Sequence, residues 1–302
     1  MIISENVYFM PDGTSIEYVT LGSGPKLLFI HGSNMNRDEK NSVLHLLAQK
    51  FTVYCADRRG WRYSGSRGND YSIEKECEDA LELITHYDIM HVFGDEYGAI
   101  IALQLALQYP LKKLVIFETS LPSLRNFDWL KKMNKQAIKG RYLDAMVTFI
   151  KGTSHKMKYI PKLYIKLIFK YSSFSIDRDK ETMAKLIEYE DPEHNARHKK
   201  DIESSELKEA KKMLAALPDE IAAAQQAEKN FNKLQSISTP VLILCGSSSE
   251  PYVYASADRL LTLLQNGQKV IIDSDFGENR GAIDPPPQDF LESVTRFLQR
   301  GE

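Results

Sequence analysis

The sequence predicts an α/β protein with a mostly parallel, doubly wound β-sheet and an inserted helical cap. Three observations support this prediction. Short apolar runs alternate with helical segments up to about residue 120, the same alternation returns after residue 236, and the stretch between them has amphipathic helical patterns with almost no strand-like run. At 302 residues, the chain is long enough for one large domain with an insertion.

The first part of the chain opens with a hairpin and then alternates strand and helix. Polarity alternates on both sides of the turn at residues 11–13, whose Pro-Asp-Gly sequence suits a tight turn. Nearly continuous apolar runs are typical of strands covered on both faces. The predicted strands are 26–32, 51–57, 90–94 and 112–118, and the predicted helices are Asp38–Gln49, Ser72–Tyr87 and Ala99–Tyr109.

The same pattern continues at the far end of the chain. The predicted strands there are 240–246 and 269–273, and the predicted helices are 254–264 and 288–300. We therefore expect residues 1–120 and 237–302 to form the core and residues 121–236 to form the helical cap.

The overall composition excludes several classes of protein. The net charge is −2 and 26% of residues are charged, so neither nucleic acid nor a membrane surface is predicted as a partner. No apolar run approaches a membrane span, no signal peptide is recognised, and the three cysteines form no pair or metal motif. We expect a cytoplasmic protein that acts on a small molecule without a cofactor.

Two charged patterns lie within the predicted cap. Lys158, Lys162, Lys166 and Lys170 follow one another at a spacing of four, which favours the solvated face of a helix over an anion-attracting lid or a membrane-surface helix. Glu190, His194 and His198 have a spacing that suits a metal on a helix. Their segment is highly charged and contains a proline, so a solvated loop is favoured and no metal site is predicted.

Four motifs occur in a fixed order along the chain. They are "FIHGSNMN" after the strand 26–32, "ADRRGWRYSGS" after 51–57, "GDEYGA" after 90–94, and "LVIFETS" before the predicted cap. With these motifs the chain resembles the α/β-hydrolase superfamily over nearly its full length. The resemblance implies the α/β-hydrolase fold with a nucleophilic serine on a tight elbow, an acid after a late strand and a histidine near the C-terminus.

The elbow motif keeps its glycines but has lost the serine. Gly94 and Gly98 frame the turn, because strand and helix pass closely there, and the residue at the apex is Glu96. We predict Glu96 as a catalytic residue. The alternative is an acid stabilised only by the helix N-terminus.

The other members of the implied triad are also replaced. No histidine follows the strand 269–273, and Glu278 stands at the implied place, with Asn279 and Arg280 as alternatives in register. Serines occupy the usual place of the late acid, with Glu250 one position beyond. Glu118, which ends its strand beside the elbow, is a further catalytic candidate.

The resemblance also implies an oxyanion hole formed by two backbone N–H groups. One belongs to the residue after the elbow, Tyr97, and the other to Ser33 or Asn34 in the loop entered through His31. The "ADRRG" turn, with Asp57, Arg58 and Gly60, is interpreted as structural.

These residues predict acid–base chemistry. Glu96 and Glu278 would share a proton, because two adjacent carboxylates do not both ionise cheaply. This suits a lyase, isomerase or cyclase acting on a small, largely apolar carbonyl compound. The alternatives are a hydrolase, with Glu96 as nucleophile or in a water-activating pair, and a catalytically silent module for ligand binding or protein interaction. Dehalogenases and epoxide hydrolases resemble the chain in having an elbow carboxylate, but theirs is an aspartate and they keep the histidine.

Overall fold

The computed structural model describes residues 3–33, 42–166, 192–272 and 288–300. Its contacts divide the chain into two compact units. The first unit contains Met1–Arg125 and Asp219–Glu302, and the second contains Asn126–Pro218.

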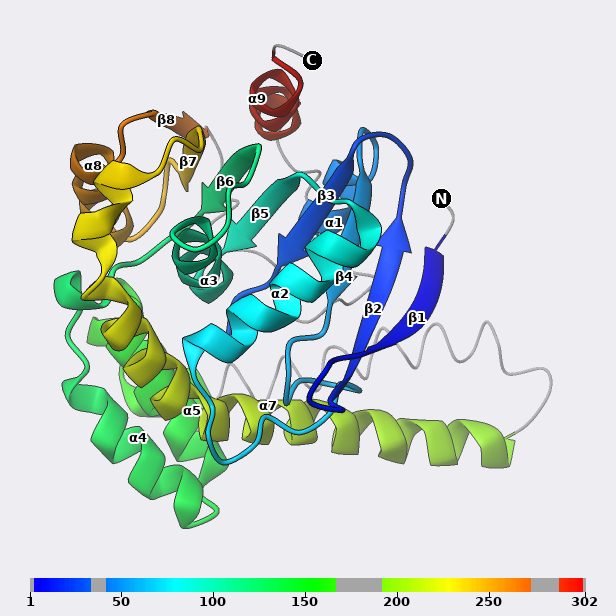
Figure 1. The fold of residues 1–302 in the computed structure, drawn as a ribbon. Coiled ribbons are helices and arrows are strands. Elements are labelled where there is room, and N and C mark those ends of the chain that lie inside the picture. Colours follow the sequence, from blue (N-terminus) through cyan, green and yellow to red (C-terminus); the bar gives the residue numbers. More distant parts are fainter. Residues whose placement is uncertain (1–2, 34–41, 167–191, 273–287, 301–302) are drawn as a thin grey trace. The chain divides into compact units, whose positions relative to one another are not determined.

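The first unit contains an eight-stranded sheet in the order β1-β2-β4-β3-β5-β6-β7-β8 (Figure 1). The strands are β1 (Ile3–Phe9), β2 (Ser15–Leu21), β3 (Lys26–Ile30), β4 (Thr52–Ala56), β5 (His91–Asp95), β6 (Lys113–Phe117), β7 (Val241–Gly246) and β8 (Gly267–Ile272). The pairs β1–β2 and β2–β4 are antiparallel, and all other pairs are parallel. The predicted fold class is confirmed.

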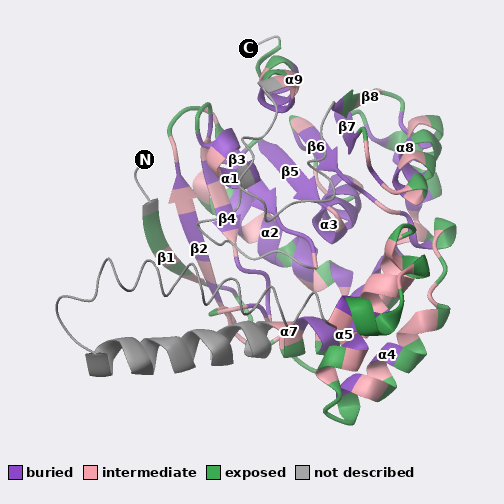
Figure 2. Ribbon diagram, turned by 180° about the vertical axis from the view of Figure 1, so that it is seen from behind, coloured by how far each residue is buried: buried purple, intermediate pink, exposed green. Residues whose placement is uncertain are grey.

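Helices of the first unit cover both faces of this sheet. They are α1 (Ser42–Leu47), α2 (Ile73–Tyr87), α3 (Tyr97–Ala106), the end of α7 (Pro192–Glu228) from Asp219, α8 (Pro251–Leu263) and α9 (Gln288–Gln299), with the short 3-10 helices η1 (Pro122–Leu124) and η3 (Phe231–Ser236). One apolar core joins α2, α3 and α8 to the sheet, and a second joins α1 and α9 to it. Val92 and Phe93, neighbours in β5, enter different cores because successive side chains of a strand point to opposite faces. Figure 2 shows the central strands as buried.

The strand order fixes where a site can form. Strand β3 lies between β4 and β5. The chain passes from β3 to β4 on one edge of β3, and β5 then pairs with the opposite edge. In open α/β sheets, ligands bind at the carboxyl ends of the strands where the order reverses in this way. The loop after β3 and the turn after β5 both leave the sheet at that point.

The described part of the second unit is helical. It contains α4 (Asp128–Ile138), α5 (Tyr142–Thr153), the 3-10 helix η2 (Met157–Tyr159) and the part of α7 (Pro192–Glu228) up to Pro218. A Cβ on Gly152 would lie 2.2 Å from the ring of Trp129, so glycine is needed where α5 passes α4. This unit is shorter than the predicted insertion 121–236, and its role as a cap remains a prediction.

Three predicted helices differ from the structure at their ends. The helix predicted over Ala99–Tyr109 is α3, which starts and ends earlier, at Tyr97 and Ala106. The helix predicted from residue 254 begins at Pro251, because proline without its N–H is well suited to the first helical turn. The helix predicted over Asp38–Gln49 is described only as α1, since residues 34–41 lie outside the described part of the chain.

Candidate functional site

Glu96 lies on a strained turn between β5 and α3. Its backbone has φ 48° and ψ −109°, and its N–H donates a hydrogen bond to the Phe117 carbonyl at 3.0 Å. A residue other than glycine in such a conformation costs about 1–3 kcal/mol, and such strain is concentrated at functional sites. The side chain is only partly buried.

Three glycines explain why the elbow is so tight. A Cβ on Gly98 would lie 2.0 Å from the Ile30 carbonyl oxygen, and one on Gly94 would lie 2.6 Å from the Cα of Ala99. A Cβ on Gly32 would lie 2.6 Å from Glu96 Oε2. The Glu96 carboxylate therefore lies against the backbone of the loop after β3, which is the predicted oxyanion loop.

The predicted oxyanion donors are only partly described. Tyr97 is the first residue of α3, where N–H groups lack partners within the helix and favour negative charge. The Tyr97 side chain is buried, with its hydroxyl 2.9 Å from that of Tyr71, so a binding role for Tyr97 rests on its backbone N–H. Ser33 directly follows Gly32, and Asn34 lies outside the described residues.

Glu118 is buried and held by the loop after β7. One carboxylate oxygen accepts hydrogen bonds from the Gly246 N–H at 2.8 Å and from the Ser249 hydroxyl at 2.5 Å. Asp95 pairs with Phe117 in the sheet, so Glu96 and Glu118 leave adjacent strands at the same level. Both have positive φ, 48° and 52°. The catalytic role of Glu118 remains a prediction.

Glu278 lies outside the described residues, as do its register alternatives Asn279 and Arg280. The predicted pair of Glu96 with Glu278 therefore remains a prediction.

Tyr252 and Arg125 form a pair that the sequence analysis missed. The guanidinium carbon of Arg125 lies 4.5 Å from the centre of the Tyr252 ring. Burial raises the pKa of Tyr252, Arg125 opposes this rise, and Glu96, Glu250 and Glu118 add to it. The Tyr252 phenol therefore remains protonated at neutral pH, within electrostatic range of the Glu96 carboxylate. The one sequence signal for Tyr252 was its position at the start of a helix that follows a late strand.

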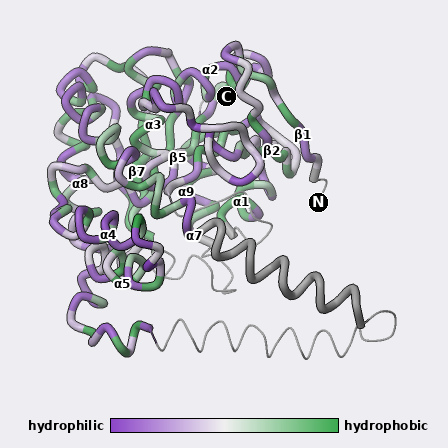
Figure 3. Tube along the Cα trace, turned by 90° about the horizontal axis from the view of Figure 1, so that it is seen from below, coloured by the Kyte–Doolittle hydropathy of each residue, from purple (hydrophilic) through white to green (hydrophobic). Residues whose placement is uncertain are grey.

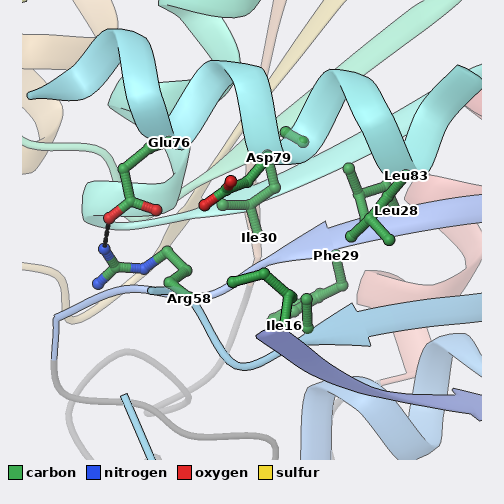
Figure 4. Close-up of a pocket in the computed structure, with 10 residues that line it drawn as sticks. Ile16, Leu28, Phe29, Ile30, Arg58, Glu76, Asp79 and Leu83 are labelled. Atoms are coloured by element: carbon green, nitrogen blue, oxygen red, sulfur yellow. Dashed lines mark hydrogen bonds and ion pairs between the residues drawn. The ribbon is translucent and has the colours of Figure 1, made fainter. Parts of the chain in front are cut away.

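Arg58 is the centre of a buried ionic network beside the site. Its guanidinium contacts Glu76 at 2.6 Å and Glu220 at 2.8 Å, and its Nε donates to the His31 carbonyl at 3.1 Å (Figure 4 shows the contact with Glu76). All three charged side chains are almost completely buried. Burial opposes the Arg58 charge, but Glu220 and Glu76 raise its pKa above the usual value. Arg58 therefore fixes the oxyanion loop as well as its own turn.

Glu220 extends the network to residues distant in the sequence. It lies near the end of α7 and also accepts hydrogen bonds from the indole N–H of Trp61 at 3.2 Å and from Arg67 at 3.0 Å. Although burial raises the pKa of Glu220, Arg58 and Arg67 bring it below the usual value. No motif in the sequence pointed to this residue.

His31 is a neutral support of the same loop. Its Nε2 accepts a hydrogen bond from the Arg58 backbone N–H at 3.1 Å, and its Nδ1 lies 2.8 Å from the Gly32 carbonyl oxygen. Nδ1 therefore carries the proton. Burial, followed by the positive charge of Arg58, lowers the pKa of His31 to about 3. Its imidazole is engaged on both sides, so it is not placed to act as a catalytic base.

A small cavity between α2 and the sheet is separate from the candidate site. It is lined by Ile16, Leu28, Ile30 and Leu83 together with Arg58, Glu76 and Asp79 (Figure 4). Its volume of about 30 Å³ suits roughly two water molecules.

The described residues lack two further features. They contain no group of three or more histidine, cysteine, aspartate or glutamate side chains that could hold a metal ion. No helix within these ranges is long and apolar enough to cross a membrane.

Comparison with known proteins agrees with the fold. Residues 25–158 match the family model of the alpha/beta hydrolase fold. An alpha/beta hydrolase structure from Sphaerobacter thermophilus has a TM-score of 0.69 and 21% identity, covering 97% of this chain and 100% of that one. The chain is an α/β-hydrolase-fold protein. The enol-lactonase structure from Burkholderia xenovorans is also similar to this α/β-hydrolase-fold protein, with a TM-score of 0.63 and 16% identity over 98% and 100% of the two chains.

Curated relatives match a shorter part of the α/β-hydrolase-fold protein. The uncharacterized hydrolase YraK of Bacillus subtilis is 33% identical over 114 residues, which are 36% of this chain and 42% of the relative. A soluble epoxide hydrolase of Corynebacterium is 33% identical over 99 residues, 32% and 35% of the two proteins. The chain spans less than half the length of these curated relatives.

The first prediction concerns the buried network. Glu220→Gln removes a negative charge that compensates the buried guanidinium of Arg58. We therefore expect the free energy of unfolding to fall by about 3–5 kcal/mol, measured by urea denaturation. Asp144→Asn is the matched control, because its partner Arg141 is 60% exposed and such a pair contributes about 1 kcal/mol or less. Equal losses in the two variants would contradict the central role of Glu220.

The second prediction concerns pH. The folded protein holds His31 neutral with a pKa of about 3, whereas the unfolded chain protonates it below 6.5. The stability from neutral His31 is therefore complete above pH 6.5 and is lost as the pH falls towards 3. Between pH 6.5 and 4, wild type should lose roughly 3 kcal/mol more stability than His31→Gln, which cannot be protonated.

The matched control for this pH series is His86→Gln, since His86 is exposed. The free energy of unfolding is measured from pH 8 to 4. Its dependence on pH should be the same in His86→Gln as in wild type, and weaker in His31→Gln. Parallel curves for all three proteins would show that His31 does not carry this dependence.

Proposed function

We propose that this α/β-hydrolase-fold protein is an enzyme in which Glu96 acts as a general base on a small, largely apolar carbonyl compound, in a reaction of the lyase, isomerase or cyclase type. The observation that carries the proposal is the position of the Glu96 carboxylate, on a strained elbow and against Gly32 of the oxyanion loop. A partly exposed carboxylate beside backbone donors suits removal of a proton next to a carbonyl group.

In this proposal the backbone around Glu96 holds the substrate. The carbonyl oxygen accepts hydrogen bonds from the Tyr97 N–H and from the loop containing Ser33, and negative charge develops on it as the proton leaves. The N-terminus of α3 favours that charge. The network of Arg58 and His31 keeps the loop in place before substrate arrives, so little reorganisation is needed during the reaction.

Tyr252 is the proposed proton donor. Its phenol stays protonated and its ring is held against Arg125, while the charge of Glu96 acts on the same hydroxyl. Glu118 supports this side of the site by binding Gly246 and Ser249, which precede α8. Glu278 remains the alternative donor predicted from the sequence.

A second candidate function is hydrolysis with Glu96 as nucleophile. It is favoured by the place of Glu96 on the elbow and by the similarity of the chain to the soluble epoxide hydrolase of Corynebacterium. In such a mechanism the Glu96 carboxylate attacks an epoxide carbon, the ring C–O bond breaks and its oxygen takes a proton, which leaves an ester. Water then attacks the acyl carbon, releases the diol and restores the carboxylate.

The third prediction tests Glu96 as a base. A base that removes a proton next to a carbonyl group allows deuterium to enter that carbon from heavy water. We expect wild type to catalyse this exchange on at least one of acetophenone, phenylacetone and cyclohexanone, as measured by mass spectrometry. Glu96→Gln should lower the exchange rate by about 100-fold or more.

Glu74→Gln is the control for this experiment, because Glu74 lies exposed on α2 and should leave the rate unchanged. Tyr252→Phe should slow exchange if Tyr252 is the donor and leave it unchanged if Glu278 is. Equal rates for wild type and Glu96→Gln would rule out Glu96 as the base, and no exchange on any ketone would favour a silent binding module.

The fourth prediction separates the two enzymatic candidates. We expect no heavy oxygen in the peptide that contains Glu96 after reaction with styrene oxide in water labelled with ¹⁸O, because a base forms no ester. A nucleophilic Glu96 would retain one labelled oxygen after hydrolysis, since water attacks the acyl carbon. Mass spectrometry of that peptide distinguishes the outcomes, with Glu96→Gln as the unlabelled reference.

A further inference from the structure

The second unit carries a strong local positive charge that the net charge of the whole chain hides. The chain as a whole has a net charge of −2. Between Asn126 and Lys166, however, there are ten lysine and arginine residues and two aspartates, Asp128 and Asp144. Asp144 is shared between Arg141, at 2.7 Å, and Lys166, at 2.5 Å.

Three lysines of this unit come together from different segments. They are Lys132 on α4, Lys151 on α5 and Lys162, which follows η2 and Pro161. The positive charge of Lys132, followed by burial and the charge of Lys151, lowers the pKa of Lys162, and the charge of Asp144 opposes this. Ammonium groups held this close repel one another, and an anion placed beside them relieves that repulsion.

Exposed apolar side chains are interleaved with these lysines. Tyr159, Leu163 and Tyr164 are 74%, 68% and 65% exposed, and Lys158 and Lys162 lie among them in the sequence and are also exposed. Single exposed apolar residues are common, but three in six consecutive positions, two of them tyrosines, are unusual. Tyrosine is enriched where protein meets the headgroup region of a membrane, and lysine binds anionic headgroups while its stem stays apolar.

We propose that residues 158–164, together with Lys132 and Lys151, form a surface that binds membranes containing anionic phospholipids. Charge complementarity selects an anionic partner. The exposed Leu163 and the two tyrosines favour a lipid surface over nucleic acid. Their apolar surface leaves water when it enters the boundary below the headgroups, and this transfer stabilises the bound state. Figure 3 shows hydrophilic and hydrophobic positions interleaved along α4 and α5 of this unit.

This surface is independent of the proposed chemistry. It attaches the protein to a membrane and does not span it, in agreement with the absence of a spanning helix among the described residues. The exclusion of membranes in the sequence analysis used the net charge of the whole chain. The second unit is strongly positive between Asn126 and Lys166, although the whole chain is not.

The fifth prediction is tested by sedimentation of the full chain with vesicles. We expect binding to phosphatidylcholine vesicles containing about 30% phosphatidylserine and none to phosphatidylcholine alone, and we expect salt at about 1 M to abolish binding. Lys132→Gln with Lys162→Gln should weaken binding by about 25-fold, since each lysine near an anionic surface contributes roughly fivefold. Tyr159→Ser with Leu163→Ser should weaken it as well, through loss of buried apolar area.

The matched control is Lys112→Gln with Lys229→Gln, two exposed lysines of the first unit, and it should bind as wild type does. Melting curves establish that every variant is folded. Equal binding to both kinds of vesicle, no binding to either, or a lysine variant that binds like the control would overturn the proposal. Binding to duplex DNA in place of vesicles would also overturn it. None of these results bears on the role of Glu96.

Discussion

Arg58 carries a full positive charge into the interior of the first unit, and the carboxylates of Glu76 and Glu220 neutralise it there. An isolated charge in that position would cost many kcal/mol, so the arginine and its two partners fold together or not at all. The three residues come from the turn after β4, from α2 and from the end of α7. Two ion pairs that share one guanidinium thus fix three segments that are remote in the sequence.

The same guanidinium supports the candidate site. It binds the His31 carbonyl oxygen, and the Arg58 backbone N–H binds the His31 ring. The loop after β3 is therefore held through both the backbone and the side chain of His31, close to the Glu96 carboxylate. On the other side of Glu96, the register of β5 and β6 places Glu118 at the same level. Backbone geometry fixed before any ligand binds is what an active site requires.

Local signals explain what the sequence could predict. The apolar strand runs reflect burial on both faces of the sheet, and the glycines around Glu96 reflect approaches that leave no room for a Cβ. Both effects leave a mark in short stretches of sequence, as apolar runs and as the glycine pair around Glu96, so the fold and the position of Glu96 could be predicted. Glu220 could not, because it is one of many acids in a helical region and its partners lie more than 150 residues away. Tyr252 and Arg125 were missed for a similar reason, since their relation to Glu96 depends on how separate strands and helices meet.

The contact between Glu96 and Gly32 has a consequence for how this protein would be classified in practice. Phosphonate and boronate reagents identify serine hydrolases by bonding to a hydroxyl oxygen at the elbow, with backbone donors open in front of it. Here the elbow presents a carboxylate beside that backbone and offers no hydroxyl oxygen for such a reagent to bond to. A survey of a proteome with such reagents would count this protein among the inactive members of its fold, whether or not Glu96 is catalytic. Reagents that esterify carboxylates are the appropriate chemical probe for this elbow.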